Sequence, residues 1–340
     1  MKRVLKKLVF GLLALLALTV IVGATWEQLA RRAAARRFPA PGKLVDIGGR
    51  RIQLDCRGGG VPTVVLIHGL DVGGALSWSA VHDSIARTTR TCAYSRAGIM
   101  WSDPTPAFTP TGMVTDLHAA LAAGGERPPF VLVGHSLGGP ISLLYTKQHG
   151  DQVAGLVMVD ASHPEQFTRF KELGISTENA AVRLLQVAAA LSWTGVGRLL
   201  ASQIRPMPNQ AMDVALAQRA WAPRSIRGAI TEMTAFDAIF AEAATARSLG
   251  DRPLVVLTAM KPMSAEERRG VGITEEQAQG QKKMWLEMHQ EEMRWSTAGR
   301  QVVLPDASHY IQFDRPDVVT AAVVDVVAAV RGGGRHDLAP

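Results

Sequence analysis

Residues 130–139 read Phe-Val-Leu-Val-Gly-His-Ser-Leu-Gly-Gly, which is the most informative segment of the chain. The apolar run 130–133 is typical of a buried strand, and apolar residues recur at helical spacing over 141–145. Ser136 therefore falls on a sharp turn between a strand and a helix, where its hydroxyl is exposed. The flanking glycines avoid collisions with neighbouring elements. We interpret 134–138 as a nucleophile elbow; a glycine-rich turn around an inert serine is the alternative.

The general base that a serine nucleophile needs is expected at His309. This histidine follows the strand-like run 301–304 and precedes a helix that starts near Pro316. It would lie in a loop at the carboxyl end of a strand, on the same edge of the sheet as Ser136. The order of serine first and histidine late in the chain also fits an elbow-type enzyme. A lone histidine is otherwise more often a packing or surface residue.

Two backbone amides are expected to form an oxyanion hole. An early strand is predicted over 63–67, and His68-Gly69-Leu70-Asp71 follows as its exit loop. Oxyanion donors in such a site come from the residue after the nucleophile and from the loop after an early strand. The N–H groups of Leu70 and Leu137 are therefore predicted as the donors. We expect His68 to brace the loop; a purely structural turn is the alternative.

These motifs resemble the α/β-hydrolase superfamily over roughly residues 42–331, in particular its serine-nucleophile branch with a helical cap. The segments Arg96-Ala97-Gly98 and Trp101-Ser102-Asp103-Pro104 also match the pattern. The resemblance implies an α/β fold with an eight-stranded, mostly parallel sheet and a Ser-His-acid triad. The chain departs from the family at Ser95, where aspartate is usual, and at Met100, where glycine is common. Both positions lie on the loop after the fourth strand.

The acid of the triad is assigned to Asp160. Many members of the superfamily carry it after the seventh strand, expected here at 253–258, but residues 259–264 contain no carboxylate. The other position used in the superfamily is the end of the sixth strand, and the apolar run 155–159 ends in Asp160. A carboxylate there would accept the Nδ1–H of the histidine and fix its tautomer. Glu266 and Glu267 are the fallback candidates.

The positive charge is confined to the start of the chain. The formal net charge is +7, and residues 1–40 hold eight Lys or Arg and one Glu, so the remainder is neutral. A nucleic-acid-binding domain would carry its basic residues on the folded surface, so that function class is excluded. The distribution indicates a basic membrane anchor instead.

The predicted anchor is a charge-free apolar stretch over 8–25, which is long enough to span a bilayer core. Four basic residues precede it, and four more lie within 31–37. A cleaved signal peptide is the rival interpretation, because Val22-Gly23-Ala24 has the small residues of a cleavage site. We favour a retained single-pass anchor with a cytoplasmic N-terminus, which places the catalytic domain outside the cytoplasm.

Strand and helix patterns alternate from 63 to 160, which predicts a parallel sheet with helices on both faces. Hairpin strands are expected at 43–47 and 51–56 around Gly48-Gly49, and helices at 78–88, 109–123 and 137–149. About ninety residues after Asp160 lack a convincing strand and read as helices. Their apolar faces, which include a Met and aromatic stripe over 230–244, would roof the pocket, although plain packing is the commoner role of such a stripe. The helix over 275–295 is expected to pack on the core.

The predicted organisation is a membrane anchor and basic linker (1–40), a first part of the core (41–160), a helical cap insertion (161–250), a second part of the core (251–331) and a disordered tail (332–340).

No cofactor or metal is implied. Cys56 and Cys92 lack nearby partner ligands, and no G-x-G-x-x-G loop follows the first parallel strand. The resemblance implies that the strand ending at Cys56 runs antiparallel beside the one beginning near Cys92. That arrangement would allow a disulfide in an exported domain. Two reduced, buried cysteines are the alternative.

The predicted function is a membrane-anchored serine hydrolase, of carboxylesterase or lipase type, that cleaves an ester or related acyl bond through an acyl-enzyme. Its expected partners are a small apolar acyl or ester substrate and the membrane. Epoxide hydrolases and dehalogenases need a carboxylate nucleophile where Ser136 stands, so those branches are disfavoured. An acyltransferase and a non-catalytic receptor or scaffold on the same fold are the alternatives. The natural substrate and the oligomeric state stay open.

Overall fold

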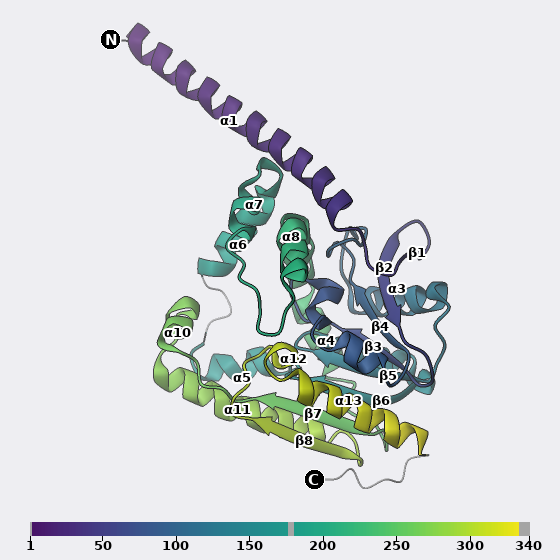
Figure 1. Ribbon diagram of the computed structural model, residues 1–340. Coiled ribbons are helices and arrows are strands. Elements are labelled where there is room, and N and C mark those ends of the chain that lie inside the picture. Colours follow the sequence, from purple (N-terminus) through teal and green to yellow (C-terminus); the bar gives the residue numbers. More distant parts are fainter. Residues whose placement is uncertain (1, 176–179, 333–340) are drawn as a thin grey trace.

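The computed structural model describes residues 2–175 and 180–332 and contains one eight-stranded sheet (Figure 1). The strands run in the spatial order β1-β2-β4-β3-β5-β6-β7-β8. The β1–β2 and β2–β4 pairs are antiparallel and all other pairs are parallel, which confirms the expected mostly parallel sheet. The strands are β1 (Lys43–Asp46), β2 (Arg51–Arg57), β3 (Thr63–Ile67), β4 (Thr91–Ser95), β5 (Phe130–His135), β6 (Val153–Val159), β7 (Leu254–Ala259) and β8 (Gly299–Leu304).

Helices cover both faces of this sheet, as the alternation of strand and helix patterns predicts (Figure 1). The α-helices are α1 (Lys2–Arg37), α2 (His82–Ala86), α3 (Pro110–Gly124), α4 (Gly138–Gln148), α5 (Gln166–Glu172), α6 (Ala180–Ala190), α7 (Val196–Ala201), α8 (Met212–Met233), α9 (Phe236–Ala243), α10 (Ala265–Val271), α11 (Glu275–Met293), α12 (Ile311–Asp314) and α13 (Pro316–Arg331). Short 3-10 helices are η1 (Gly74–Trp78), η2 (Gly150–Gln152) and η3 (Ser192–Thr194).

The sheet separates two apolar cores because successive side chains of a strand point to opposite faces. In β3, Val65 and Ile67 pack with α3, α4 and α9, whereas Val64 and Leu66 pack with η1, α2 and α13. All four side chains are fully buried. The central strands therefore read as continuous apolar runs, which is what a parallel sheet covered on both faces requires.

The structure confirms the predicted hairpin and corrects the predicted helix over 78–88. The hairpin between β1 and β2 closes with an Ile47 N–H to Arg50 C=O hydrogen bond of 2.8 Å, around two glycines with φ of +99° and +86°. Both central residues of such a turn need positive φ, which glycine adopts without strain. The helix expected over 78–88 is instead divided into η1 and the five-residue α2, so that prediction was too long.

Between β6 and β7 the described residues form helices α5 to α9 and no named strand, in line with the prediction of a helical insertion. The aromatic stripe of α9 packs in the core beside α4: Ile239 is fully buried and Phe240 is 5% exposed. Plain packing, the commoner role of such a stripe, is therefore its role here. The domain boundaries given above stay predictions from the sequence. All of the predicted tail except Gly332 lies outside the described residues.

Helix α1 runs without a break through both the apolar segment and the second basic cluster. Its most apolar 18-residue window has a mean hydropathy of 2.5, and none of that window is buried in the protein. A helix of this length and composition is able to cross a membrane, although a signal sequence has the same properties. Beyond the apolar segment, the buried Glu27 carboxylate lies 2.9 Å from the Arg198 guanidinium on α7. The end of α1 is thus docked on the helical insertion (Figure 1).

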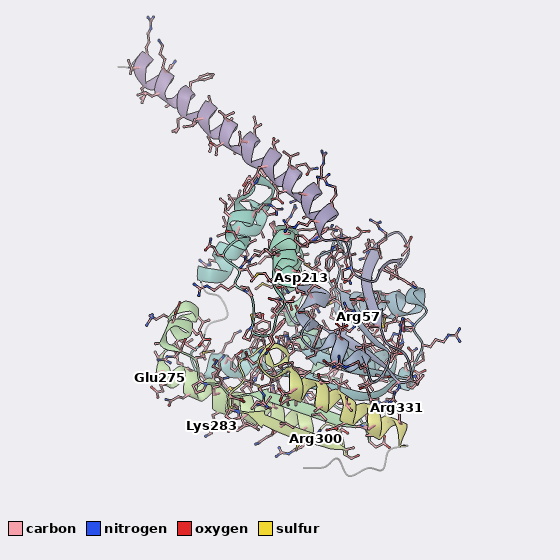
Figure 2. The ribbon with its side chains drawn as sticks, viewed as in Figure 1. Arg57, Asp213, Glu275, Lys283, Arg300 and Arg331 are labelled. Atoms are coloured by element: carbon pink, nitrogen blue, oxygen red, sulfur yellow. A yellow bond between two sulfur atoms is a disulfide. The ribbon has the colours of Figure 1, made fainter. Side chains whose placement is uncertain are left out.

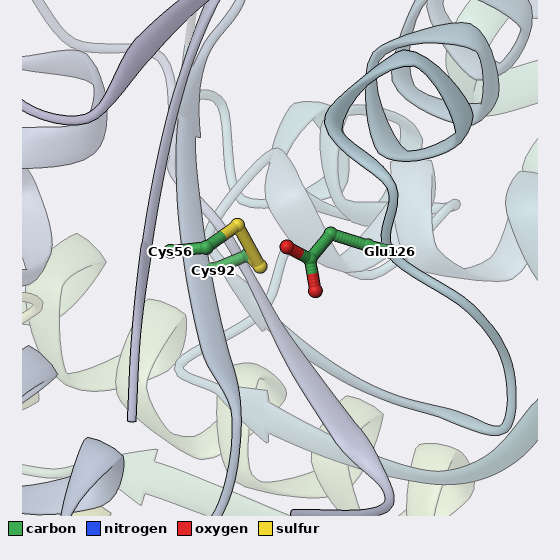
Figure 3. A group of neighbouring side chains, drawn as sticks. All are labelled: Cys56, Cys92 and Glu126. Atoms are coloured by element: carbon green, nitrogen blue, oxygen red, sulfur yellow. A yellow bond between two sulfur atoms is a disulfide. The ribbon is translucent and has the colours of Figure 1, made fainter. Parts of the chain in front are cut away.

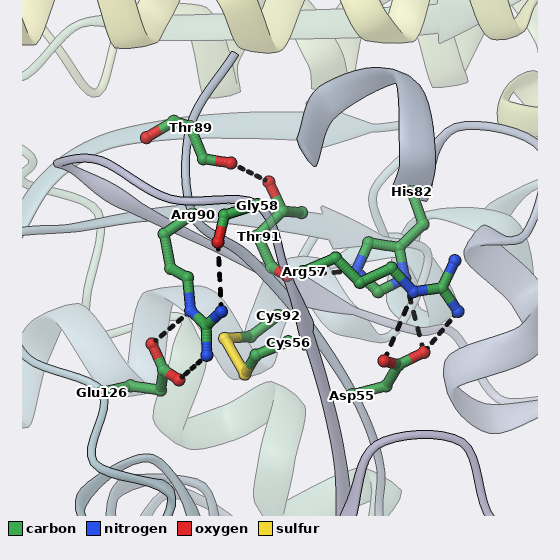
Figure 4. Close-up of a disulfide and its surroundings, with 10 residues drawn as sticks. All are labelled: Asp55, Cys56, Arg57, Gly58, His82, Thr89, Arg90, Thr91, Cys92 and Glu126. Atoms are coloured by element: carbon green, nitrogen blue, oxygen red, sulfur yellow. Dashed lines mark hydrogen bonds and ion pairs between the residues drawn. A yellow bond between two sulfur atoms is a disulfide. The ribbon is translucent and has the colours of Figure 1, made fainter. Parts of the chain in front are cut away.

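A disulfide joins Cys56 of β2 to Cys92 of β4, which are direct partners in the antiparallel register (Figure 4). The structure thus contains the bridge rather than the reduced pair. A partly buried ion pair lies beside it, in which the Arg90 guanidinium contacts the Glu126 carboxylate at 2.6 Å. The covalent link closes a sequence separation of 36 residues, which restricts the unfolded chain.

Replacing both cysteines by serine is expected to lower the free energy of unfolding by about 3 to 4 kcal/mol, because loop-closure entropy returns to the unfolded chain. Thermal or urea unfolding of the oxidised parent and of the Cys56→Ser/Cys92→Ser double variant measures the difference. Peptide mass spectrometry of the non-reduced parent is the control. Two free thiols in protein from its native compartment would contradict the bridge.

Candidate active site

Ser136 sits at the junction of β5 and α4 with φ of +50°, in the left-handed region that non-glycine residues rarely adopt. Close backbone approaches hold this turn. A Cβ added at Gly134 would lie 2.5 Å from the Gly138 carbonyl oxygen, and one added at Gly138 would lie 2.1 Å from the Ile67 carbonyl oxygen. Neither position has room for a side chain, so the strained turn at Ser136 follows from the glycines around it.

His309 and Asp160 lie in direct contact although 149 positions separate them in the sequence. Their Nδ1 and Oδ2 atoms are 2.7 Å apart. The other carboxylate oxygen of Asp160 accepts hydrogen bonds from the Ala259 backbone N–H at 2.8 Å and from the Trp285 indole N–H at 2.9 Å. Burial favours the neutral acid, but the His309 and Trp285 hydrogen bonds and the nearby histidine charges outweigh it, so the pKa of Asp160 is lowered. The carboxylate is therefore ionised near neutral pH.

The two fallback acids lie elsewhere. Glu267 is exposed and caps the start of α10, where its carboxylate accepts the Ser264 backbone N–H at 2.6 Å. Glu266 is also exposed, in the first turn of the same helix. The contact with His309 thus belongs to Asp160 among the three candidate carboxylates.

His135 connects the elbow to the histidine loop, a role that the motif alone does not reveal. Its ring Nε2 lies 2.9 Å from the backbone oxygen of His309, and the two rings lie 4.7 Å apart. Burial, followed by the nearby His309 charge, lowers the pKa of His135 to about 3. His135 is therefore neutral, and its Nε2–H donates to the His309 carbonyl.

A cavity of about 230 Å³ opens directly over these residues. Ser136, Asp160 and His309 are among the residues that line it. The walls come from the residues that follow β6, from α5, from the segment after β7 and from α11: Ser162, Gln166, Phe170, Met263, Gln281, Lys282 and Trp285. The helical insertion therefore contributes α5 to the wall, whereas the expected roof from the α9 stripe is absent because that stripe packs against α4. Helix α11 packs on β7 and β8 as predicted, but Trp285 also faces the cavity.

The loop expected to carry one oxyanion donor passes close to the elbow. A Cβ added at Gly69 would lie 2.9 Å from the Ser136 Cβ. Arg96, from the loop after β4, donates to the carbonyls of His68 at 2.5 Å and Gly69 at 2.7 Å. Its guanidinium also contacts Glu232 of α8 through two hydrogen bonds, and both charged groups are buried. This pair ties the helical insertion to the loop.

The two departures from the family pattern have structural explanations. Met100 adopts φ of +50°, a conformation that glycine tolerates better, which explains why glycine is common there. The Met100 amide donates to the Ser225 hydroxyl at 2.8 Å, which anchors the loop to α8. Ser95 donates to the Gln53 amide oxygen at 2.7 Å and accepts from the Ala75 N–H at 3.1 Å. The hydroxyl thus serves as a buried bracing group.

Among the described residues, one group has the ligand types for a metal: Cys56, Cys92 and Glu126, whose ligand atoms lie within 4.8 Å of one another (Figure 3). The two sulfurs are bonded to each other and provide no thiolate. The Glu126 carboxylate is engaged by Arg90. We assign no metal to this group.

A model of the Alpha/beta hydrolase family matches residues 64–322 of the chain. The chain therefore belongs to the α/β-hydrolase family, and the family and fold together support a hydrolase. Among curated proteins it is 23% identical over 172 residues to the uncharacterized protein YbdG of Bacillus subtilis, an alignment that covers 50% of this chain and 53% of that protein. The chain thus spans about half the length of this relative.

Solved structures share the fold. A thermophilic esterase from Thermogutta terrifontis superimposes with a TM-score of 0.56 at 19% identity, covering 83% of this chain and 94% of the esterase. A putative epoxide hydrolase from Pseudomonas aeruginosa gives 0.59 at 20% identity, covering 88% and 99%. Both are similar in fold alone, because identities this low do not carry an activity from one chain to another.

Glu232→Gln is expected to lower the free energy of unfolding by about 3 kcal/mol, because it leaves the buried Arg96 guanidinium without its counter-charge. Thermal unfolding in detergent measures the effect. Glu242→Gln is the matched control, since Glu242 lies 3.8 Å from Lys147 in a partly exposed pair whose loss should cost less than about 1 kcal/mol. Equal effects of the two substitutions would show that the buried pair is not a structural link.

Proposed function

We propose that this chain is a membrane-anchored serine esterase that works through the triad Ser136, His309 and Asp160. The observation that carries the proposal is the convergence of three loops on one cavity. The strained elbow after β5, the end of β6 and the loop after β8 each contribute one of the three side chains to its lining. The 2.7 Å contact between His309 Nδ1 and Asp160 Oδ2 supports His309 as the base and Asp160 as the acid that orients it.

In the proposed reaction the Ser136 hydroxyl oxygen attacks the carbonyl carbon of an ester, while His309 Nε2 takes the hydroxyl proton. Asp160 accepts the Nδ1–H of His309, which fixes the tautomer and stabilises the imidazolium. The N–H groups of Leu70 and Leu137 stabilise the negative charge on the carbonyl oxygen. His309 then protonates the leaving alkoxide, and a water molecule activated by the same nitrogen releases the acid from Ser136.

The size of the cavity favours a small acyl group. At about 230 Å³ it falls below the usual range of ligand sites, so a long acyl chain would extend beyond the described walls. Phe170, Met263 and Trp285 provide an apolar surface, and Lys282 and the glutamine side chains add polar groups at the wall. Esters with a short, apolar acyl part are the substrate class that this lining supports.

The anchor part of the proposal is supported by how α1 joins the folded domain. Gly23 lies so close to η3 that an added Cβ would be 2.2 Å from the Thr194 carbonyl oxygen, and Glu27 pairs with Arg198. Cleavage after Ala24 would remove the first of these contacts, which favours retention of the helix. A disulfide between Cys56 and Cys92 is typical of an oxidising compartment and supports export of the domain.

Ser136→Ala and His309→Ala are each expected to reduce hydrolysis of p-nitrophenyl acetate by roughly 10³-fold or more, and the double variant is expected to be little worse, because the triad acts as a unit. Asp160→Asn should cost about 10²- to 10⁴-fold. Glu267→Gln, which alters the fallback acid, is the matched control and should retain parental turnover. A fluorophosphonate probe should label Ser136 in the parent.

Three outcomes would contradict this assignment. Independent, multiplicative losses at Ser136 and His309 would separate their roles. Parental activity in Asp160→Asn, combined with loss of activity in Glu267→Gln, would assign the acid of the triad to Glu267 instead of Asp160. A folded parent that the fluorophosphonate does not label would favour a non-catalytic scaffold.

The full-length chain is expected to stay with membranes after high-salt and carbonate washes, because its apolar segment requires a hydrocarbon environment. Salt would strip a protein held by basic residues alone. A truncated chain that begins at Trp26 keeps Glu27 and the basic cluster and is the matched control, expected in the soluble fraction. Release of the full-length chain, or a mature N-terminus at Thr25, would refute a retained anchor.

A further inference from the structure

A second and larger cavity lies between the end of α1, the helical insertion and the loop after β4. Its volume is about 710 Å³, and the catalytic residues are not among its lining residues. Five arginines line it, together with Glu27 as the one carboxylate in the lining: Arg31, Arg32, Arg198, Arg224 and Arg227. The remaining wall is largely apolar and includes Ala34, Ala97, Phe108 and Trp221. A cavity with this lining suits an amphiphilic anion.

The positive charge in this cavity is not neutralised by the protein. Glu27 is shared between Arg31 at 2.7 Å and Arg198 at 2.9 Å. Within the described part of the chain, Arg227 has no carboxylate within 4.0 Å, and Arg224 approaches Asp103 only at 3.9 Å. Burial lowers the pKa of Arg224, Asp103 only partly restores it, and Arg31 adds to the lowering. An anion between these side chains would relieve this repulsion.

The depth of the cavity relative to the bilayer follows from α1. The predicted apolar segment ends at Thr25, and Arg31 lies six residues further along the helix, or about 9 Å at 1.5 Å per residue. The head-group layer outside the hydrocarbon is about 5 to 8 Å thick on each side. Because arginine side chains reach several ångströms from the backbone, the lining guanidinium groups fall at the level of the lipid phosphates.

Exposed apolar residues of the insertion support the same depth. Trp193 and Leu199 are 47% and 60% exposed, and Thr194 between them contacts Gly23 inside the apolar segment of α1. Val196 and Leu200 are also exposed. The short helix η3 between α6 and α7 packs on α1, and Figure 1 shows α7 next to α1. Exposed apolar side chains at the height of Gly23 would contact the boundary between the lipid head groups and the acyl chains. Tryptophan is common at this interface in membrane-bound proteins.

We propose that this cavity binds the phosphate group of an anionic membrane phospholipid, with the arginines on the phosphate and the apolar wall along the start of its acyl chain. The proposal rests on the membrane anchor proposed above, because the anchor sets the level of the cavity. It is independent of the triad. Phosphate is the shared chemistry of a lipid head group and of the free ion, and the depth of the site favours the lipid.

The test reconstitutes the full-length protein in vesicles of equal parts phosphatidylcholine and phosphatidylglycerol, extracts it in mild detergent, and counts retained lipids by native mass spectrometry. The parent should retain phosphatidylglycerol about tenfold over phosphatidylcholine. Arg224→Gln/Arg227→Gln should abolish the preference while leaving the charges flanking the anchor unchanged. Lys283→Gln/Arg300→Gln removes equal charge at the far side of the domain (Figure 2) and should retain the preference.

Ala35→Trp fills the cavity from α1 without changing its charge and should also abolish the preference. This variant replaces Arg224→Gln/Arg227→Gln as the test when the arginine variant folds poorly. Parental retention in the folded Arg224→Gln/Arg227→Gln variant, or equal losses in both charge variants, would overturn a defined site. Displacement of the lipid by inorganic phosphate at matched concentration would show that the free ion is the ligand. Release of the parent by carbonate would refute the anchor and with it the placement of the cavity at the level of the lipid phosphates. Lipid retention is measured separately in detergent, so failure of the arginine site itself is a distinguishable outcome.

Discussion

The contact between the β5–α4 turn and the end of β3 is the constraint on which the site depends. Gly138 lies against the Ile67 carbonyl so closely that no Cβ fits, and this proximity holds Ser136 at a positive φ. β3, β5 and β6 are parallel neighbours, so their carboxyl ends place the Gly69 loop, Ser136 and Asp160 side by side. His309 comes from the more distant β8, and its loop is held by contacts to His135 and Asp160.

A buried ion pair extends this arrangement to the helical insertion. The Arg96 guanidinium binds the carbonyls of the Gly69 loop on one side and Glu232 on the other, away from water. Buried pairs are weak contributors to net stability but are costly to break, because one charge would be left without a partner. The insertion therefore has one favoured position relative to the loop over Ser136. The geometry of the site depends on a helix that is far from it in sequence.

The elbow, the alternation of strands and helices and the place of Asp160 at the end of a strand could be predicted from the sequence, because each rests on a local pattern of apolar runs and glycines. The eight-stranded sheet and the pairing of Asp160 with His309 were expected only from the resemblance to a family. The disposition of Trp285, His135 and Glu232 could not. A tryptophan in a Met- and Trp-rich helix carries no sign that its indole N–H will reach a carboxylate 125 positions away. The α9 stripe was ambiguous for the same reason: periodicity identifies an apolar face, but only tertiary packing decides whether that face covers a cavity or α4.

The unbroken helix α1 couples the motion of the folded domain to that of its apolar segment. A domain joined to its anchor by a flexible linker can tumble, and its cavity then faces the membrane only part of the time. Here the helix continues through Arg37 and rests on α7 and α8, so the folded domain would share the tilt and rotation of α1 in the membrane that we propose for it. In a membrane such a chain would present its cavity at a constant height and orientation. Encounter with a substrate would then be governed by lateral diffusion in the plane of the bilayer rather than by rotational search.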